Sequence, residues 1–343
     1  MKLIHCADIH LDSRMQTNLT AEQARSRNAE ITATFLDLIR FAREQQVRAV
    51  LIAGDLFDGS RVSPRTVATV LDAMEATPGV DYLYLPGNHD EQGLQIAGRP
   101  LPGNVHCFGA DWEYVDLGGA VAAGAMEPDC DGLSLDPKRT NIVMLHGQVG
   151  TDVDLGSLRG KNIDYLALGH IHSFRQEKLD YRGSWCYSGC LEGRGFDETG
   201  EKGFVLLDVD STGIQTRFQP FARRTIHSIK VDVSDCPGNA QVVAAIREAA
   251  EGIPAEDLVE VTLVGTCDPE TMISAGYVGR LLSGAYYTLK IKDETTLPRE
   301  QRQGTLSLKG EFLRLVEQSA HTEEEKNAMI RMGLAALAGE EVN

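Results

Sequence analysis

Apolar residues in this chain fall into short runs, and several of these runs stop abruptly at small or polar residues. Four to six apolar residues followed by Gly, Asp, Asn or His predict a buried strand that ends in a loop. Five segments share this design, at 2–10, 48–55, 81–90, 141–147 and 164–172.

Helical patterns separate the first three predicted strands. Residues 21–46 place apolar side chains on one helical face, and Ser63 followed by Pro64 predicts the start of a second helix. Alternating strands and helices indicate right-handed crossovers and largely parallel pairing. Residues 203–213 predict hairpin strands that close a second sheet.

The pattern changes near residue 222, which predicts a separate small domain. Strands and helices alternate as β-α-β-α-β without polar clusters at the strand ends, and a polar connector and two helices follow Pro298. A capping box from Thr322 to Glu325 opens the last helix, whose apolar face either packs on its own domain or docks another chain. The predicted domains are 1–222, 223–297 and 298–343.

The five predicted strands end in residues that suit metal binding. If the strands are neighbours, these side chains project into one cleft at the carboxyl ends of the strands. Oxygen and nitrogen donors without thiolate favour Mn²⁺, Fe²⁺ or Zn²⁺ over Ca²⁺ or an iron–sulfur cluster. The donors are too many for one ion, so we expect two ions bridged by Asp55 from a central strand. The set is Asp8, His10, Asp55, Asn88, His89, His146, His170 and His172.

Each of these motifs alone is more often a turn, a cap or a hydrogen-bonded histidine than part of a functional site. Their joint occurrence in this order makes that explanation improbable for the whole set. We interpret the remaining histidines as structural or surface residues; they are His5, His106, His227 and His321.

Composition limits the classes of function. The chain has 343 residues, enough for one large and one smaller domain, and no apolar stretch approaches the length of a membrane span. Its opening residues reach Asp8 and His10 before a signal peptide could form, so we expect a cytoplasmic protein. The seven scattered cysteines are expected to be free thiols. A net charge of −17 argues against a free-standing DNA-binding module, because it repels a polyanion.

In order along the chain, these motifs resemble those of the calcineurin-like metallophosphoesterases. They are the D-x-H of Asp8 and His10, GDLFD (54–58), GNHD (87–90), HG (146–147) and GHIH (169–172). Within that superfamily, HCADIHLD, GDLFDGSRVSP and GRGFDETGEKG are most similar to SbcD-type DNA repair nucleases and the related YhaO group. The resemblance implies an α/β fold: a four-layer α-β-β-α sandwich with a small α+β cap domain and a helical C-terminal tail.

The resemblance also implies roles for individual residues. One metal ion would take Asp8, His10, Asp55 and His172, and the other would take Asp55, Asn88, His146 and His170. A metal-bridged hydroxide would attack phosphorus, His89 would protonate the leaving alkoxide, and Asp58 would orient His89. Arg14, Arg61 and Arg194 lie near the motif loops as candidate phosphate contacts, although isolated arginines are more often ordinary surface charges.

The implied function is a Mn²⁺-dependent DNA exo- or endonuclease subunit in DNA repair, with Fe²⁺, Zn²⁺ and Mg²⁺ as alternative ions. The implied partners are DNA, an SbcC-like ABC-type coiled-coil ATPase docked on the C-terminal helices, and a second copy of the chain. Two alternatives stay open: a small-substrate or cyclic-nucleotide phosphodiesterase or phosphatase on the same scaffold, and a non-catalytic scaffold. A Ser/Thr protein phosphatase is disfavoured because Gly59 and Ser60 follow Asp58 where those enzymes have Arg-Gly.

Overall fold

The computed structural model divides the chain into two compact units, Met1–Ile226 and His227–Asn343. It describes residues 1–15, 19–59, 62–90, 93–94, 98–267, 273–296 and 308–337. Among these residues, every helix is too short or too polar to cross a membrane. The first unit contains two sheets and the second contains one, and each unit has hydrophobic core residues of its own.

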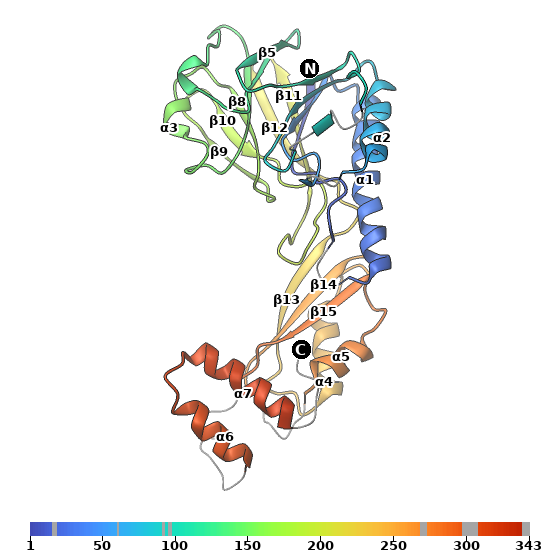
Figure 1. Cartoon of the computed structure of the whole chain (residues 1–343), viewed down its shortest axis with the longest axis vertical. Coiled ribbons are helices and arrows are strands. Elements are labelled where there is room, and N and C mark those ends of the chain that lie inside the picture. The colour runs from blue at the N-terminus through green and yellow to red at the C-terminus, as the bar shows by residue number, and fades with distance from the viewer. Residues whose placement is uncertain are drawn as a thin grey trace. The chain divides into compact units, whose positions relative to one another are not determined.

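The first unit contains two six-stranded sheets (Figure 1). In spatial order, the first consists of β12 (Gly213–Pro220), β11 (Gly203–Asp210), β1 (Lys2–Cys6), β2 (Ala49–Ala53), β3 (Asp81–Leu85) and β4 (Val105–Cys107). The second consists of β5 (Glu113–Asp116), β6 (Val121–Gly124), β7 (Asn141–His146), β8 (Tyr165–Gly169), β10 (Ser184–Tyr187) and β9 (Arg175–Lys178).

The pairing confirms the parallel arrangement predicted for the first three strands. β1 pairs with β2, and β2 with β3, in parallel register. The prediction for residues 203–213 was correct in part. β11 and β12 do form a hairpin, but β11 pairs antiparallel with β1, so the hairpin extends the first sheet and not the second.

Helices cover the outer face of the first sheet. α1 (Ala21–Glu44) begins at a capping box formed by Thr20 and Gln23, and α2 (Pro64–Glu75) begins with Ser63 as N-cap, as predicted. Among the described residues, the second sheet is covered by α3 (Leu155–Leu158), the 3₁₀ turn η3 (Cys130–Gly132) and loops. The unit is therefore an α-β-β-α sandwich whose fourth layer is thin.

Three hydrophobic layers explain why the strands are apolar on both faces. In β1, Ile4 and Cys6 pack beneath the helices, whereas Leu3 faces the second sheet. Consecutive side chains of a strand point to opposite faces, so a strand buried on both sides needs an uninterrupted apolar run. Burial on both faces therefore explains the apolar runs from which the strands were predicted.

The five strands that end in polar clusters belong to two sheets, three to the first and two to the second. The condition that the five strands are neighbours is therefore not met within a single sheet. β2 packs against β7 and β8 across the sandwich, so the carboxyl ends of both strand groups meet at one edge. Convergence of the polar residues arises from packing of two sheets as well as from parallel pairing.

The second unit has a three-stranded sheet in the order β13 (Ile226–Asp232), β14 (Leu258–Val264) and β15 (Thr288–Asp293). α4 (Asn239–Ala249) and α5 (Ala275–Leu281) contribute Val242, Ile246 and Val278 to its core. The predicted start of the second helix, at 268–269, lies outside the described residues. α6 (Leu308–Glu317) and α7 (Glu323–Leu337) pack on each other, and Thr322 forms the predicted capping box with Glu325.

Candidate active site

Four of the predicted ligand residues have a left-handed backbone. The φ angles are +52° for Asp8, +49° for His10, +48° for Asp55 and +100° for His170. Side chains other than glycine rarely adopt this region, and such strain gathers at functional sites. Hydrogen bonds between the two turns hold the geometry: the Asp8 N–H donates to the carbonyl of Gly54, and the His10 N–H to that of Asp55.

Three glycines of the motifs are required by close approach of the chain to the ligand side chains. A Cβ on Gly87 would lie 2.2 Å from Asp55 Oδ1, and one on Gly54 would lie 1.9 Å from His146 Nδ1. A Cβ on Gly169 would meet the carbonyl oxygen of Ala53 at 1.8 Å. Glycine at these places lets the strand ends from both sheets converge.

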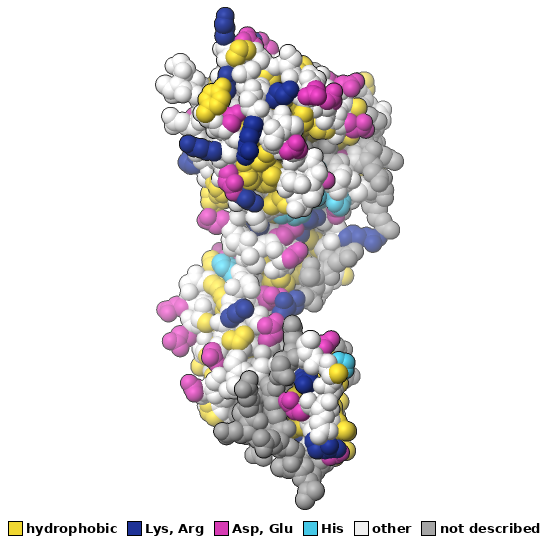
Figure 2. Space-filling model, turned by 90° about the vertical axis from the view of Figure 1, so that its left-hand side faces the viewer, with side chains coloured by type: hydrophobic (Ala, Val, Ile, Leu, Met, Phe, Trp, Pro, Cys, Tyr) yellow, Lys and Arg dark blue, Asp and Glu magenta, His cyan; other side chains and the backbone are white. Residues whose placement is uncertain are grey.

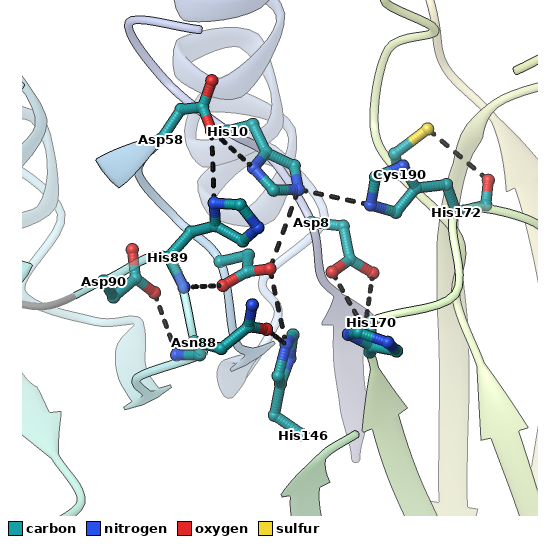
Figure 3. A network of polar contacts seen from close by, with 12 residues as sticks. Asp8, His10, Asp58, Asn88, His89, Asp90, His146, His170, His172 and Cys190 are labelled. Atoms are coloured by element: carbon teal, nitrogen blue, oxygen red, sulfur yellow. Dashed lines mark hydrogen bonds and ion pairs between the residues drawn. The ribbon is translucent and has the colours of Figure 1, made fainter. Parts of the chain in front are cut away.

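One group of converging donors consists of Asp8, His10 and His172. The Nε2 atoms of the two histidines lie 3.2 Å apart, so both rings point to the same place (Figure 3). The Asp8 carboxylate faces this place while it accepts the backbone N–H of His170 at 2.9 Å. Two imidazole nitrogens and a buried carboxylate can hold one divalent cation.

A second group consists of Asp8, Asp55 and His146. Asn88 joins it, because its Oδ1 lies 3.0 Å from His146 Nε2. Asp55 Oδ2 lies 3.4 Å from His146 Nε2 and 3.8 Å from His10 Nε2, between the two groups. This is where a carboxylate shared by two cations would lie.

His170 belongs to neither group of converging donors. Its ring stands edge-on to that of His146, with the ring centroids 5.5 Å apart. The structure therefore brings His170 beside the second group, on the side of His146. The two histidines of GHIH face different groups, since His172 lies against His10 and His170 against His146.

Charges in the site are strongly coupled. Burial lowers the pKa of His146, but its hydrogen bond to Asp55 and the nearby carboxylates outweigh burial and raise the pKa to about 9. Burial raises the pKa of Asp8 to about 6, against the opposing effect of His146 and His172. Buried carboxylates balanced only by imidazoles form a site with affinity for additional positive charge.

Asp58 lies between two histidines. Its Oδ1 is 3.5 Å from Nδ1 of both His89 and His10. The nearby His10, together with Ser13 and the charge of Arg194, holds the pKa of Asp58 well below its usual range. His89 is half exposed and donates its backbone N–H to Asp55 Oδ1 at 2.9 Å, so its ring stands at the open side of the site.

Two buried carboxylates at the site were missed by the sequence analysis. Asp90 accepts the backbone N–H groups of Leu56, Phe57 and Gly87, and so fixes the turn that carries Asp55 against the turn that carries Asn88. Glu198 Oε1 lies 2.7 Å from His172 Nδ1. Asp90 is part of GNHD and could have been found there, whereas no ligand spacing points to Glu198.

The candidate phosphate-binding arginines have different surroundings. Arg14 is exposed, and Arg61 lies outside the described residues. Arg194 is mostly buried, and its guanidinium donates to Glu198 at 3.2 Å and to the hydroxyl of Ser13 at 3.2 Å. Arg194 is therefore already engaged within the site.

The histidines interpreted as structural have partners of their own. His5 is buried and shares a hydrogen bond with the hydroxyl of Tyr165 at 2.9 Å. The other three form ion pairs away from the candidate ligands, His106 with Glu113, His227 with Asp257 and His321 with Glu325. All seven cysteines are free, as expected.

Comparison with known proteins identifies the family of the chain. The family model described as calcineurin-like phosphoesterase matches residues 1–174. The chain is 27% identical to the metallophosphoesterase YhaO of Bacillus subtilis over 306 residues, 80% of this chain and 74% of that protein.

Two further relatives carry names from DNA metabolism. The chain is 24% identical to the DNA double-strand break repair protein Mre11 of Methanosarcina acetivorans, covering 88% of this chain and 52% of that protein. It thus spans only about half the length of this relative. It is 32% identical over 94 residues to one subunit of the nuclease SbcCD of Rhodobacter capsulatus, 26% of this chain and 22% of that protein. The chain belongs to the calcineurin-like phosphoesterase family and is a metal-dependent phosphoesterase.

Proposed function

We propose that the site holds two divalent cations and hydrolyses phosphodiesters. The position of Asp55 carries the proposal, because its carboxylate lies within 4 Å of a histidine from each donor group. One cation would be held by Asp8, His10, Asp55 and His172, and the other by Asp55, Asn88, His146 and His170. Mixed imidazole and oxygen donors favour Mn²⁺, with Fe²⁺, Zn²⁺ and Mg²⁺ as alternatives.

The residues of the chain would share the work of hydrolysis. When bound, two cations activate the attacking water and neutralise charge on the phosphoryl oxygens. His89 would donate a proton to the leaving alkoxide from the exposed side of the site. Asp58, 3.5 Å from His89 Nδ1, would orient the ring and stabilise its charged form.

DNA is the substrate that we favour. The support comes from relatives named as a DNA double-strand break repair protein and as a nuclease subunit. The net charge of −17 requires that DNA affinity come from local basic side chains such as Arg14, Arg61 and Arg194, from the cations or from a partner. Acidic and basic side chains are interspersed over the face seen in Figure 2. We propose an SbcC-like ABC-type ATPase as that partner, a second copy of the chain as a further one, and a cytoplasmic location.

We also propose that the chain has three domains with different roles. Residues 1–222 would form the catalytic domain, 223–297 a cap domain that selects the substrate, and 298–343 the docking segment for the ATPase. Exposed apolar side chains on α6 and α7, among them Leu315 and Met332, are consistent with docking.

A small phosphodiester is the second candidate substrate. A pocket of about 540 Å³ lies beside the second donor group, lined by Asn88, His146 and His170 together with Met126 and Asp152. This volume is within the range of sites for small ligands, including nucleotides.

One assay series separates the candidates. Purified protein with Mn²⁺ is offered single-stranded circular DNA, a chromogenic phosphodiester and a phosphopeptide, each with and without chelator. We expect Mn²⁺-dependent cleavage of DNA and of the chromogenic ester, both lost in Asp55→Asn. Ester cleavage without DNA cleavage would favour the small substrate, and cleavage of the phosphopeptide alone would contradict the proposal.

A further inference from the structure

The segment 188–202, between β10 and β11, closes around His172 from outside the residues that match the family model. Lys202 Nζ donates a hydrogen bond of 2.8 Å to the carbonyl oxygen of His172. The backbone N–H of Cys190 donates to the same oxygen at 3.4 Å. The backbone of a candidate ligand residue is thus held by a segment that lies outside the residues matched by the family model.

Glu198, in the same segment, also holds the imidazole ring of His172. The side chain is only 9% exposed, and its Oε1 accepts a hydrogen bond of 2.7 Å from His172 Nδ1. The backbone N–H of Arg194 donates to Oε2 at 2.7 Å, and Arg194 Nη2 donates to Oε1 at 3.2 Å. A carboxylate with this many donors is fixed in place and remains charged.

The segment is in turn anchored on α1. Glu192 is buried and accepts hydrogen bonds from Arg27 Nη2 at 3.2 Å and from the hydroxyl of Thr34 at 2.7 Å. Arg27 is itself only 1% exposed and also donates to the carbonyl of Gly193 at 2.8 Å. The position of Glu198 therefore derives from a rigid connection to the first helical layer.

The hydrogen bond to Glu198 decides which nitrogen of His172 is available. A neutral imidazole has one N–H donor and one acceptor nitrogen. With Nδ1–H donated to Glu198, the lone pair of Nε2 faces His10 Nε2, 3.2 Å away, and the first donor group. A carboxylate that accepts the other ring N–H of a metal-binding histidine also increases the basicity of that histidine and its affinity for the cation.

We propose that Glu198 is a positioning residue for the cation at Asp8, His10 and His172, and that it leaves the other cation unaffected. The inference rests on the proposed two-cation site and deepens it. The selectivity follows from geometry, because Glu198 contacts His172, which belongs to the first donor group. His146, in the second donor group, has other described contacts: Asp55, Asn88, His170 and the carbonyl of Ala53.

The test is calorimetric titration of the metal-free full chain with Mn²⁺. The wild type is expected to bind two ions. In Glu198→Gln, which removes the charge and keeps the shape, we expect one site to weaken by about 10- to 100-fold while the other keeps its affinity. The matched control is Asp197→Asn, an exposed carboxylate one residue earlier, which should bind as the wild type does.

The outcomes distinguish this inference from the proposed function. Fewer than two ions bound by the wild type would contradict the two-cation site itself. Two ions bound by the wild type, with both affinities unchanged or equally weakened in Glu198→Gln, would overturn the role of Glu198 alone. Nitrogen NMR of His172 in the metal-free wild type gives a measurement without a variant: we expect the Nδ1–H form, and the Nε2–H form would overturn the inference.

Discussion

At the residue scale, the site depends on backbone conformations that few side chains tolerate. Asp8, His10, Asp55 and His170 each have positive φ, at a cost of about 1–3 kcal/mol per residue. Hydrogen bonds between neighbouring turns and the close approach at Gly54, Gly87 and Gly169 hold these conformations in place. Stability is thus given up locally so that donors from both sheets face one another.

His89 can be tested as the proton donor by changing the leaving group. His89→Gln should lower kcat/KM for DNA by about 10²- to 10⁴-fold, because the alkoxide leaves without a proton. With a p-nitrophenyl ester the loss should be much smaller, since that leaving group is stable without protonation. Steady-state rates on both substrates are the measurement.

The comparison needs two controls for His89→Gln. Mn²⁺ stoichiometry should be unchanged, because neither of the two proposed cation sites includes His89. His321→Gln, at an exposed histidine of the second unit, should keep wild-type rates. An equal loss on both ester types, or a lost metal ion, would argue against a proton donor.

Gly87→Ala tests the close approach between the strand ends. The added Cβ would lie 2.2 Å from Asp55 Oδ1 and 2.6 Å from its backbone nitrogen, so the turn must shift. We expect a loss of about 1–3 kcal/mol in the free energy of unfolding and weaker Mn²⁺ binding. Urea unfolding and metal titration measure both.

Gly79→Ala is the matched control, because its Cβ would enter open space. It should change neither quantity. Wild-type metal binding in Gly87→Ala would show that the site does not depend on this contact.

The sequence could predict most of the site at this scale, and the reason is local. A ligand directly after a buried strand, such as Asp55 or His172, is visible because the apolar run stops there. Glu198 lies in a polar segment without periodicity, and only the folded chain brings it 2.7 Å from His172. Arg194 was a candidate phosphate contact near a motif loop, and its salt bridge to Glu198 cannot be inferred from its spacing to the other motifs.

At the element scale, the alternation of strands and helices predicted β1, β2 and β3 with their parallel order. It could not predict how strands divide between sheets, because that depends on pairing between residues far apart in the chain. β11 illustrates this, since it returns after some two hundred residues to pair with β1 in the first sheet. β7 and β8 belong to the opposite sheet, although their sequences resemble those of β1 to β3.

His5 on β1 and Tyr165 on β8 connect the two sheets and predict a pH dependence of stability. Burial lowers the pKa of His5 to about 3, so the unfolded chain takes up a proton below about pH 6.5 and the folded chain does not. Stability should therefore fall with decreasing pH from 6.5 towards 3, by up to about 1.4 kcal/mol per pH unit from this residue.

Urea unfolding of the wild type and of His5→Gln between pH 6 and pH 4.5 measures this contribution. The variant should lose less stability over this range, because it lacks the group that titrates. Parallel stability curves for the two proteins would show that His5 is not the source.

At the scale of the whole molecule, the chain combines a metal site with a strongly negative overall charge. With a net charge of −17, affinity for a polyanionic substrate must come from local basic side chains, from the cations or from other chains. The second unit contributes a separate sheet and core, together with helices that leave apolar side chains exposed. Raising the salt concentration should therefore weaken DNA binding by the isolated chain less than DNA binding by an assembly that contains a basic partner.

Anomalous X-ray diffraction at the manganese edge, from crystals grown with Mn²⁺, would locate the two cations that we propose to share Asp55. We expect two anomalous peaks about 3.5–4 Å apart with the Asp55 carboxylate between them. The nearer ligands should be His10 and His172 for one peak and Asn88 and His146 for the other. A single peak, or two peaks of which only one contacts Asp55, would rule out a carboxylate shared by two cations.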